Sequence, residues 1–153
     1  MEIRLARISD LKFIQDLNLK LFEKEQKEYD KLLNLNWTLG SEGEKYYSKK
    51  IKSGNIWIAL DDNKIIGYLC GDLVKAESYR NLPLAAELES MFILDEYRSK
   101  GIGKMLYDKF LKWCEVNNVK KVRVQASAQN NLAIKFYKKL GFTDYTLILE
   151  SDL

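Results

Sequence analysis

The chain has 153 residues, of which 46% are hydrophobic and 31% charged, and its formal net charge is +3. This length accommodates one ordinary domain with its own core, and the composition is that of a soluble globular protein. With no histidine and two cysteines, the sequence excludes a His-based catalytic triad and a His/Cys zinc cluster, so we expect no metal site. The mild charge, spread along the chain, does not indicate nucleic-acid binding.

Hydrophobic periodicity predicts strands and helices along the whole chain. Strands are expected at residues 2–8, 55–60, 64–74, 84–94, 120–127 and 142–150, with a tight hairpin joining the second to the third. Helices are expected after residue 10 and at residues 41–54, 103–117 and 130–141. Residues 29–40 fit neither pattern. Since no repeat, linker or low-complexity segment interrupts this order, residues 1–153 are expected to form a single α/β (α+β) domain.

The sequence gives no indication of export or membrane insertion. The chain is charged from Glu2 onward, and no apolar run approaches the ~18 residues of a membrane span. Cys70 and Cys114 are far apart and lie in apolar runs, which is typical of reduced, buried thiols. We therefore expect a cytoplasmic protein without a signal peptide.

The stretch "EYRSKGIGKM", residues 96–105, places two glycines and three basic residues between an expected strand and an expected helix. The first amides of a helix have no internal partners, and glycine lets an anion approach them closely. This pattern is compatible with a diphosphate site and equally with a tight turn carrying solvated lysines. A dinucleotide-binding G-x-G-x-x-G loop is excluded because Leu106 occupies its third glycine position, and no P-loop is present.

Two motifs in this order resemble the GNAT superfamily of acyl-CoA-dependent N-acetyltransferases. The family's pyrophosphate motif, Q/R-x-x-G-x-G/A, matches Arg98, Gly101 and Gly103. A second family motif matches, in order and spacing, Asn130, Ala133, Phe136, Tyr137, Gly141 and Phe142. The clear resemblance covers residues 55–150, whereas the first 54 residues fit the family only in outline. It implies a mixed central sheet of about six or seven strands flanked by about four helices.

The resemblance also implies acetyl-CoA as co-substrate and a set of residues that contact it. The strand at residues 91–93 would offer backbone groups to the pantetheine arm, and the turn would hold the pyrophosphate. Asn130 would contact the pantetheine or orient the acetyl end, and it also suits the N-cap of the last helix. The implied cofactor-binding residues are Met91, Phe92, Ile93, Arg98, Ser99, Lys100, Gly101, Ile102, Gly103, Lys104, Asn130, Ala133 and Tyr137.

Two residues are candidates for the chemistry. The resemblance implies that Tyr137 faces the CoA sulfur as general acid, whereas helical periodicity alone favours a core aromatic. Glu89 is the candidate base, with Glu87 in reserve, although an exposed carboxylate fits the pattern equally well. Strand alternation predicts that Glu87, Glu89 and Met91 share one face of the sheet.

The predicted activity is direct transfer of acetyl from acetyl-CoA to a primary amine of a small molecule or a peptide or protein. No cysteine intermediate is expected, because no histidine could activate a thiol. Residues 37–47 and 75–83 are expected to flank the acceptor. A homodimer is compatible with the family, and no nucleic-acid or membrane partner is expected. The alternative is a non-catalytic acyl-CoA sensor or interaction domain on the same fold.

Overall fold

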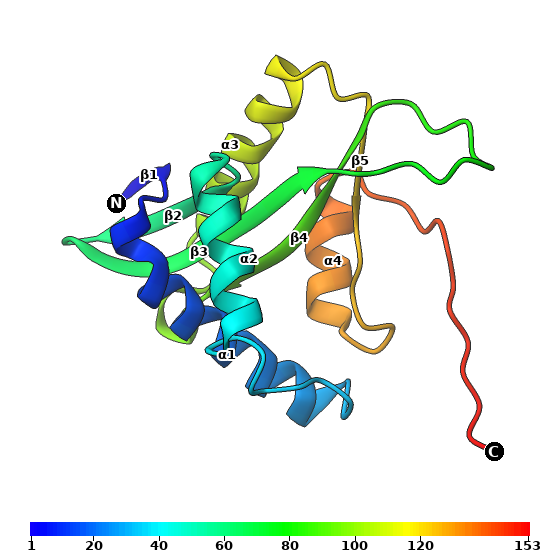
Figure 1. Cartoon of the computed structure of the whole chain (residues 1–153), viewed down its shortest axis with the longest axis horizontal. Coiled ribbons are helices and arrows are strands. Elements are labelled where there is room, and N and C mark those ends of the chain that lie inside the picture. The colour runs from blue at the N-terminus through cyan, green and yellow to red at the C-terminus, as the bar shows by residue number, and fades with distance from the viewer.

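A five-stranded sheet in the order β1-β2-β3-β4-β5 forms the centre of the computed structural model, which describes residues 1–153 (Figure 1). The strands are β1 (Glu2–Leu5), β2 (Ile56–Asp61), β3 (Lys64–Leu73), β4 (Ala85–Ile93) and β5 (Lys121–Val124). Neighbouring strands are antiparallel except β4 and β5, which run parallel. The sheet is therefore mixed, as expected for the α/β class.

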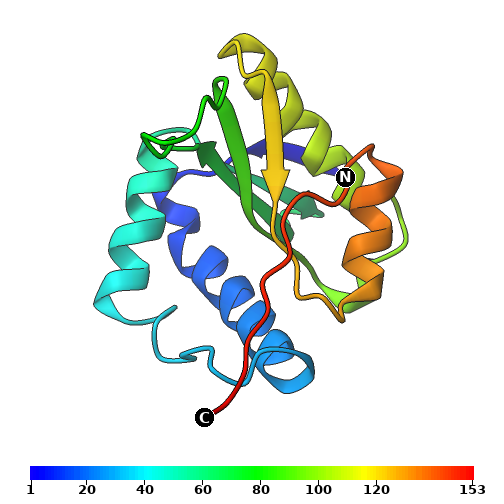
Figure 2. The same ribbon diagram turned by 90° about the vertical axis from the view of Figure 1, so that its right-hand side faces the viewer.

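Four helices cover the two faces of this sheet, in agreement with the expected number. They are α1 (Leu11–Glu28), α2 (Ser41–Lys52), α3 (Ile102–Val116) and α4 (Asn131–Lys139). Helices α1 and α2 lie on one face, and α3 and α4 lie on the other (Figures 1 and 2). None of the helices combines the length and apolarity needed to cross a lipid bilayer.

Aromatic contacts tie each helical layer to the sheet. On the α2 face, the ring of Tyr47 lies 6.2 Å from that of Tyr68 on β3. On the α3 face, Trp57 of β2 packs edge-on against Phe110, with ring centroids 5.8 Å apart. Both β2 and β3 are almost continuously buried, as expected of strands covered on both faces.

Residues 29–40, which fit no periodic pattern, dock onto α1 and α2 through buried side chains. The ring of Trp37 stacks on Phe22 at 5.9 Å and meets Tyr46 edge-on at 5.4 Å. Thr38 is fully buried, and its hydroxyl donates to the Asn18 side chain at 2.7 Å. Because these contacts are tertiary, no local repeat in the sequence indicates them.

The expected number of six or seven strands is wrong, because residues 142–150 form no strand. Their composition favours a strand, and Leu147, Ile148 and Leu149 are 72%, 75% and 82% exposed. A strand exists only when another strand accepts its backbone hydrogen bonds. Within one chain, β5 is bonded only to β4, and the terminal segment leaves the sheet (Figure 1).

Candidate active site

The turn between β4 and α3 presents backbone amides without protein partners. Ser99 and Gly101 both have left-handed backbones, with φ of 61° and 79°. Gly101 is the N-cap of α3, and no side chain caps the helix. The first-turn amides have no acceptor inside the helix, and the helix dipole adds partial positive charge there. The free amides and the partial positive charge make this end of α3 suitable for an anion.

The two glycines of the turn serve different purposes. Gly101 faces open space, so its positive φ is what requires glycine. At Gly103 a Cβ atom would lie 3.1 Å from the ring of Phe136 on α4 and 3.4 Å from the Ile93 side chain. Gly103 therefore allows α3 to pack closely against α4 and β4, which brings both motifs of the sequence together.

The side chain of Arg98 stabilises the turn itself. Its Nε donates to the carbonyl oxygen of Ile93 at 2.9 Å, and its guanidinium lies 5.1 Å from the ring centroid of Phe92. It also forms an ion pair with Asp95 at 2.9 Å. Arg98 thus fixes the path from β4 into α3, and the backbone amides are the groups left free for an anion.

The two lysines of the turn each contact a neighbouring side chain. Lys104 Nζ pairs with Asp108 one turn along α3 at 2.7 Å. Lys100 Nζ lies 5.1 Å from the ring of Tyr97. Both ammonium groups contribute positive charge around the amides of α3.

Strand β5 pairs over its whole length, but only with the first half of β4. The ladder joins Ala85 to Lys121 and ends where Leu88 meets Val124. Strand β4 continues to Ile93, so its backbone groups beyond Leu88 have no partner on the β5 side. An open strand edge of this kind can accept an extended ligand as an added strand. The edge contains the predicted residues Met91 to Ile93, although the Ile93 carbonyl already accepts from Arg98.

Helix α4 begins at the second predicted motif. The side chain of Asn130 accepts a hydrogen bond from the amide of Ala133 at 3.1 Å, which confirms the expected N-cap. The Asn130 Nδ2 donates to Glu25 of α1 at 3.3 Å, and the Ser127 hydroxyl donates to the same carboxylate at 3.2 Å. Glu25 is a residue that sequence analysis did not single out.

Tyr137 lies among aromatic rings of the α3 and α4 layer. Its ring is 5.3 Å from Phe136 and 5.7 Å from Phe142. Burial, together with the negative charge of Glu25, raises the pKa of Tyr137 to about 12. The phenol is therefore protonated at neutral pH and able to donate a hydrogen bond.

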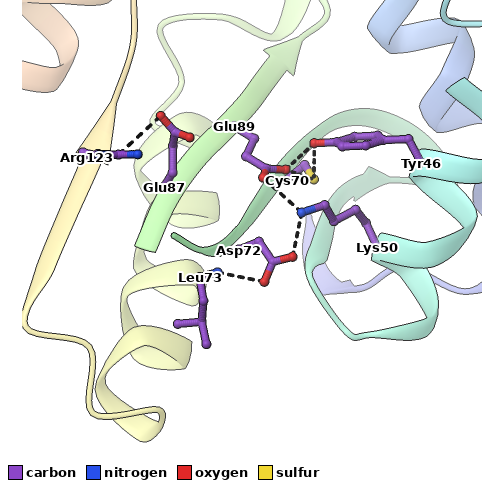
Figure 3. A network of polar contacts seen from close by, with 8 residues as sticks. All are labelled: Tyr46, Lys50, Cys70, Asp72, Leu73, Glu87, Glu89 and Arg123. Carbon is purple, nitrogen blue, oxygen red and sulfur yellow. Dashed lines mark hydrogen bonds and ion pairs between the residues drawn. The ribbon is translucent and has the colours of Figure 1, made fainter. Parts of the chain in front are cut away.

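Glu89 of β4 is the centre of a polar network with α2 and β3 (Figure 3). It accepts a hydrogen bond from the Tyr46 hydroxyl, and its other oxygen lies 3.0 Å from Lys50 Nζ. Lys50 also pairs with Asp72 of β3 at 2.6 Å. Burial lowers the pKa of Lys50, but bonds to Asp72 and Glu89 outweigh it and raise the pKa above its usual value.

The network leaves one negative charge without a cation, because Lys50 faces both Glu89 and Asp72. Tyr46 cannot act as a base there, since burial, the nearby thiol and Glu89 raise its pKa far above the ordinary range. Tyr46 and Lys50 are four residues apart on α2 and so share one helix face. In the sequence, this spacing of four residues is the only indication that Tyr46 and Lys50 belong to one network. Tyr46 also falls within residues 37–47, which were predicted to flank the acceptor.

A bulge in β4 interrupts the alternation of side chains at Glu89. Cys70 pairs with Ser90 and Gly71 with Leu88, so Glu89 is one extra residue. Glu89 and Ser90 consequently face the same side, where Ser90 accepts a hydrogen bond from Tyr68 at 3.0 Å. Met91 shares the other face with Ile93. The expectation that Glu89 and Met91 share a face is therefore wrong.

The reserve base, Glu87, is engaged elsewhere. Its carboxylate lies 3.8 Å from the guanidinium of Arg123 on β5 (Figure 3). It also accepts a hydrogen bond from the Gln125 side chain at 3.2 Å. No hydrogen bond joins it to Tyr46 or Lys50. Glu87 thus bridges β4 and β5 where the two strands are paired, whereas Glu89 lies just beyond the last paired residue of β4.

Neither cysteine suits a nucleophile. Both are buried and unpaired, as the sequence indicated. Burial and the charge of Glu89 raise the pKa of Cys70 far above its usual value. Burial raises the pKa of Cys114 to about 11. Neither thiol forms a thiolate readily at neutral pH.

The structure thus brings the predicted residues together in two groups. The turn, the end of β4 and α4 meet through Gly103 and Phe136, while Glu89 joins α2 and β3. No hydrogen bond connects Glu89 with Tyr137. The unpaired stretch of β4, between Glu89 and the turn, is the segment that both groups share.

Three features therefore occur together: a parallel strand pair that splits, an open helix N-terminus and a carboxylate at a strand bulge. They agree with the acetyltransferase family that the sequence motifs resemble. The model of the acetyltransferase (GNAT) family matches residues 12–142. The chain therefore belongs to the GNAT acetyltransferase family.

Curated relatives agree with this assignment. The N-alpha-acetyltransferase of Sulfurisphaera tokodaii is 27% identical over 130 residues, covering 79% of this chain and 78% of that protein. N-alpha-acetyltransferase 30 of Schizosaccharomyces pombe is 27% identical over 89 residues, covering 58% of this chain and 57% of that protein. The chain spans little more than half the length of some relatives that it matches, so their acceptors enter below only as proposals.

Solved structures share the fold. A mutant of the BH1408 protein from Bacillus halodurans superposes with a TM-score of 0.88 at 18% identity, covering 100% of this chain and 99% of that one. The aminoglycoside N-acetyltransferase AAC(6')-Iy, in complex with a bisubstrate analogue of CoA, gives a TM-score of 0.76 at 16% identity over 99% of this chain and 97% of that one. At such identities the likeness establishes the fold alone.

Proposed function

We propose that this chain is an acetyl-CoA-dependent N-acetyltransferase that transfers acetyl directly to a primary amine of a small molecule or a peptide. The observation that carries the proposal is the uncapped N-terminus of α3 beside the unpaired edge of β4. One feature suits a diphosphate and the other suits the extended, amide-bearing pantetheine. Structural neighbours solved with CoA support the same cofactor.

In this proposal the backbone holds the cofactor. The amides from Lys100 to Lys104 bind the pyrophosphate, while Arg98 keeps the turn in shape and Ser99 supplies its left-handed bend. The β4 residues Met91, Phe92 and Ile93 contact the pantetheine through backbone groups. At the start of α4, Asn130 and Ala133 lie next to the same path. A strand amide polarises the thioester carbonyl.

Glu89 is the proposed base, and its energetics limit how it can act. An alkyl ammonium has a pKa near 10.4 and a glutamate has one near 4.3. Direct transfer of a proton from the ammonium to the glutamate therefore costs roughly 8 kcal/mol. For an α-amino group near 7.8 the cost falls to about 5 kcal/mol. We therefore expect Glu89 to attract the ammonium and to take its proton through water, or to capture the small neutral fraction of the amine.

The net negative charge of the network around Glu89 favours a cationic acceptor. The single charge of Lys50 is shared between the carboxylates of Glu89 and Asp72, so one further positive charge would balance the network. The rings of Trp37 and Tyr46 stand beside this group and offer apolar contact. An acceptor with an ammonium next to an apolar group fits these surroundings.

Tyr137 is the proposed donor to the departing thiolate. With a pKa of about 12, full proton transfer to a thiolate with a pKa near 8.5 is uphill by about 5 kcal/mol. Tyr137 therefore acts mainly by hydrogen bonding to the developing charge, and protonation is completed as the ammonium loses its proton. Direct transfer needs no acyl-enzyme, in keeping with the raised pKa values of Cys70 and Cys114.

The test is release of CoA thiol from acetyl-CoA with a panel of amines. Peptides with free α-amino groups come first, given their lower pKa and the relatives named N-alpha-acetyltransferase, followed by lysine peptides, aminoglycosides and simple amines. We expect turnover with at least one class, and a decrease in kcat of about 100-fold in Tyr137→Phe. The matched control Tyr29→Phe, at the residue that ends α1 and outside the segments assigned to CoA or to the acceptor, retains activity.

Tight CoA binding without turnover on any amine, together with no effect of Tyr137→Phe on binding, would instead support the acyl-CoA sensor. Binding of CoA that is unaffected by changes in the α3 turn would contradict both the enzyme and the sensor.

A further inference from the structure

Glu25, in the last turn of α1, has surroundings that helix stability does not explain. A negative charge near the C-terminal end of a helix is opposed by the helix dipole. The Glu25 carboxylate accepts hydrogen bonds from the Ser127 hydroxyl at 3.2 Å and from Asn130 Nδ2 at 3.3 Å. Both donors are neutral, so they do not cancel the negative charge. The carboxylate therefore serves a contact with a segment that lies 102 to 105 residues further along the chain.

This contact bridges the two helical layers. Helix α1 covers one face of the sheet and α4 the other, and the end of α1 lies below the loop that leads into α4 (Figures 1 and 2). Strand β5 ends at Val124, where its pairing with β4 also stops. The bridge from Glu25 to Ser127 and Asn130 therefore joins the layers a few residues beyond the point where the two strands part.

The first turn of α4 depends on this bridge, because packing holds it only weakly. No residue of α4 is fully buried, and Leu132 in the first turn is 78% exposed. The close contact of α4 with α3 is made later along the helix, where the Phe136 ring lies against Gly103. A helix end with few buried contacts opens easily unless polar contacts hold it.

The bridge also fixes the orientation of the Asn130 amide. A carboxylate only accepts hydrogen bonds, so Nδ2 of Asn130 faces Glu25 and Oδ1 is left to accept from the Ala133 amide at 3.1 Å. The two bonds thus specify the same orientation of the side chain. One N–H of the Asn130 amide remains available for the pantetheine.

The charge of Glu25 also acts on Tyr137, which lies two turns along α4 from Asn130. Burial is the main cause of the raised pKa of Tyr137, and the negative charge of Glu25 adds to it. No hydrogen bond joins the two side chains. Glu25 therefore influences the phenol through space and through the placement of α4.

We propose that Glu25 is a positioning residue for acetyl transfer: its carboxylate holds Asn130 and the first turn of α4 against α1, and α4 in turn places the Tyr137 hydroxyl. This inference rests on the proposed function, since it gives Glu25 a task in that reaction. Loss of the bridge reduces the rate rather than the affinity for the acceptor, because the Tyr137 hydroxyl is needed mainly as charge develops on the sulfur.

Steady-state kinetics of Glu25→Ala with the best acceptor tests this role. We expect kcat to fall by at least about tenfold and the acceptor KM to change by less than about threefold. In an Asn130→Ala background the same change should cost less than about threefold, because the residue through which Glu25 acts is gone. Glu23→Ala, at an exposed position on the same helix, is the control and keeps the wild-type kcat. A raised acceptor KM with unchanged kcat, or equal losses in both backgrounds, overturns the proposal.

A second experiment needs no turnover. Fluorotyrosine is incorporated into the full chain, and its fluorine NMR resonance at Tyr137 is identified by its loss in Tyr137→Phe. We expect Glu25→Ala to move this resonance. Both Glu25→Ala and Glu25→Gln, which keeps the shape of the side chain, should lower the pH at which the phenol ionises by at least ~0.3 unit, since a nearby negative charge disfavours the phenolate. Glu23→Ala should change neither property.

The fluorine measurement separates failure of this inference from failure of the proposed function. If the resonance and the ionisation are unchanged in the Glu25 variants, Glu25 does not place Tyr137 and the proposal is overturned, whatever the activity. If both change while no amine is acetylated, the link between Glu25 and Tyr137 is supported and the proposed function fails.

Discussion

At the scale of single residues, Glu89 and Glu87 lie two positions apart on β4 but have different surroundings. Glu89 sits on the bulge and contacts Tyr46 and Lys50, while Glu87 faces Arg123 on β5. The sequence pattern could not indicate which glutamate is the better candidate base, because strand alternation places both on the same face of the sheet. The ion-pair partners distinguish them, and these come from distant segments of the chain on either side.

Changing Glu89→Gln tests the base assignment. We expect kcat to fall by about 100-fold with little change in the KM for acetyl-CoA, since the amide cannot take a proton but keeps the shape. Steady-state kinetics with the best acceptor measures both constants. Glu87→Gln is the matched control and loses less than about threefold. The opposite ranking would make Glu87 the base.

At the scale of elements, the junction of β4 with α3 depends on a glycine in a left-handed conformation. Gly101→Ala keeps open space around the new methyl group, but φ of 79° strains any residue with a Cβ. We expect stability to fall by about 1 kcal/mol, and the dissociation constant for CoA to rise by about tenfold as the amides turn away. Calorimetric titration with CoA measures the affinity.

Gly54→Ala is the matched control for this change. Gly54 also has a left-handed backbone, with φ of 71° and open space around it, but it follows α2 and lies outside the turn. The two variants should lose similar stability, and only Gly101→Ala should lose affinity. Equal affinities for CoA in both variants would contradict the proposal that the cofactor binds at the N-terminus of α3.

At the scale of the whole molecule, Asp10 joins β1 to the start of α1. Its carboxylate accepts from the Arg7 amide at 2.7 Å and from Arg4 at 2.8 Å, and Asp10 is 6% exposed. Burial opposes ionisation, but the bonds from Arg4 and Arg7 outweigh it and lower the pKa of Asp10. A lowered pKa stabilises the fold above the unfolded value near 3.9, and this stabilisation is lost as pH falls through the folded value.

Asp10→Asn should therefore reduce the free energy of unfolding by about 1–3 kcal/mol at pH 7. The difference from the wild type should begin to shrink as pH falls below the unfolded value near 3.9, and it should be lost once pH has fallen through the lowered folded pKa. Urea unfolding of both proteins at several pH values measures this difference in the free energy of unfolding. Asp16→Asn, which removes only an exposed 4.0 Å pair with Lys12, is the control and changes stability by less than about 0.5 kcal/mol. A pH-independent loss for Asp10→Asn would indicate a packing effect instead.

The sequence by itself determined the features that depend on near neighbours. Helix periodicity, the glycine turn at Gly101 and the Asn130 cap are local, so four helices, five strands and both motifs could be read from spacing. Tertiary structure alone decided the features that join distant segments. The β4 bulge at Glu89, the pairing of Lys50 with Asp72 and the absence of a strand at residues 142–150 depend on which strand lies beside which. A strand-forming sequence does not specify its neighbour.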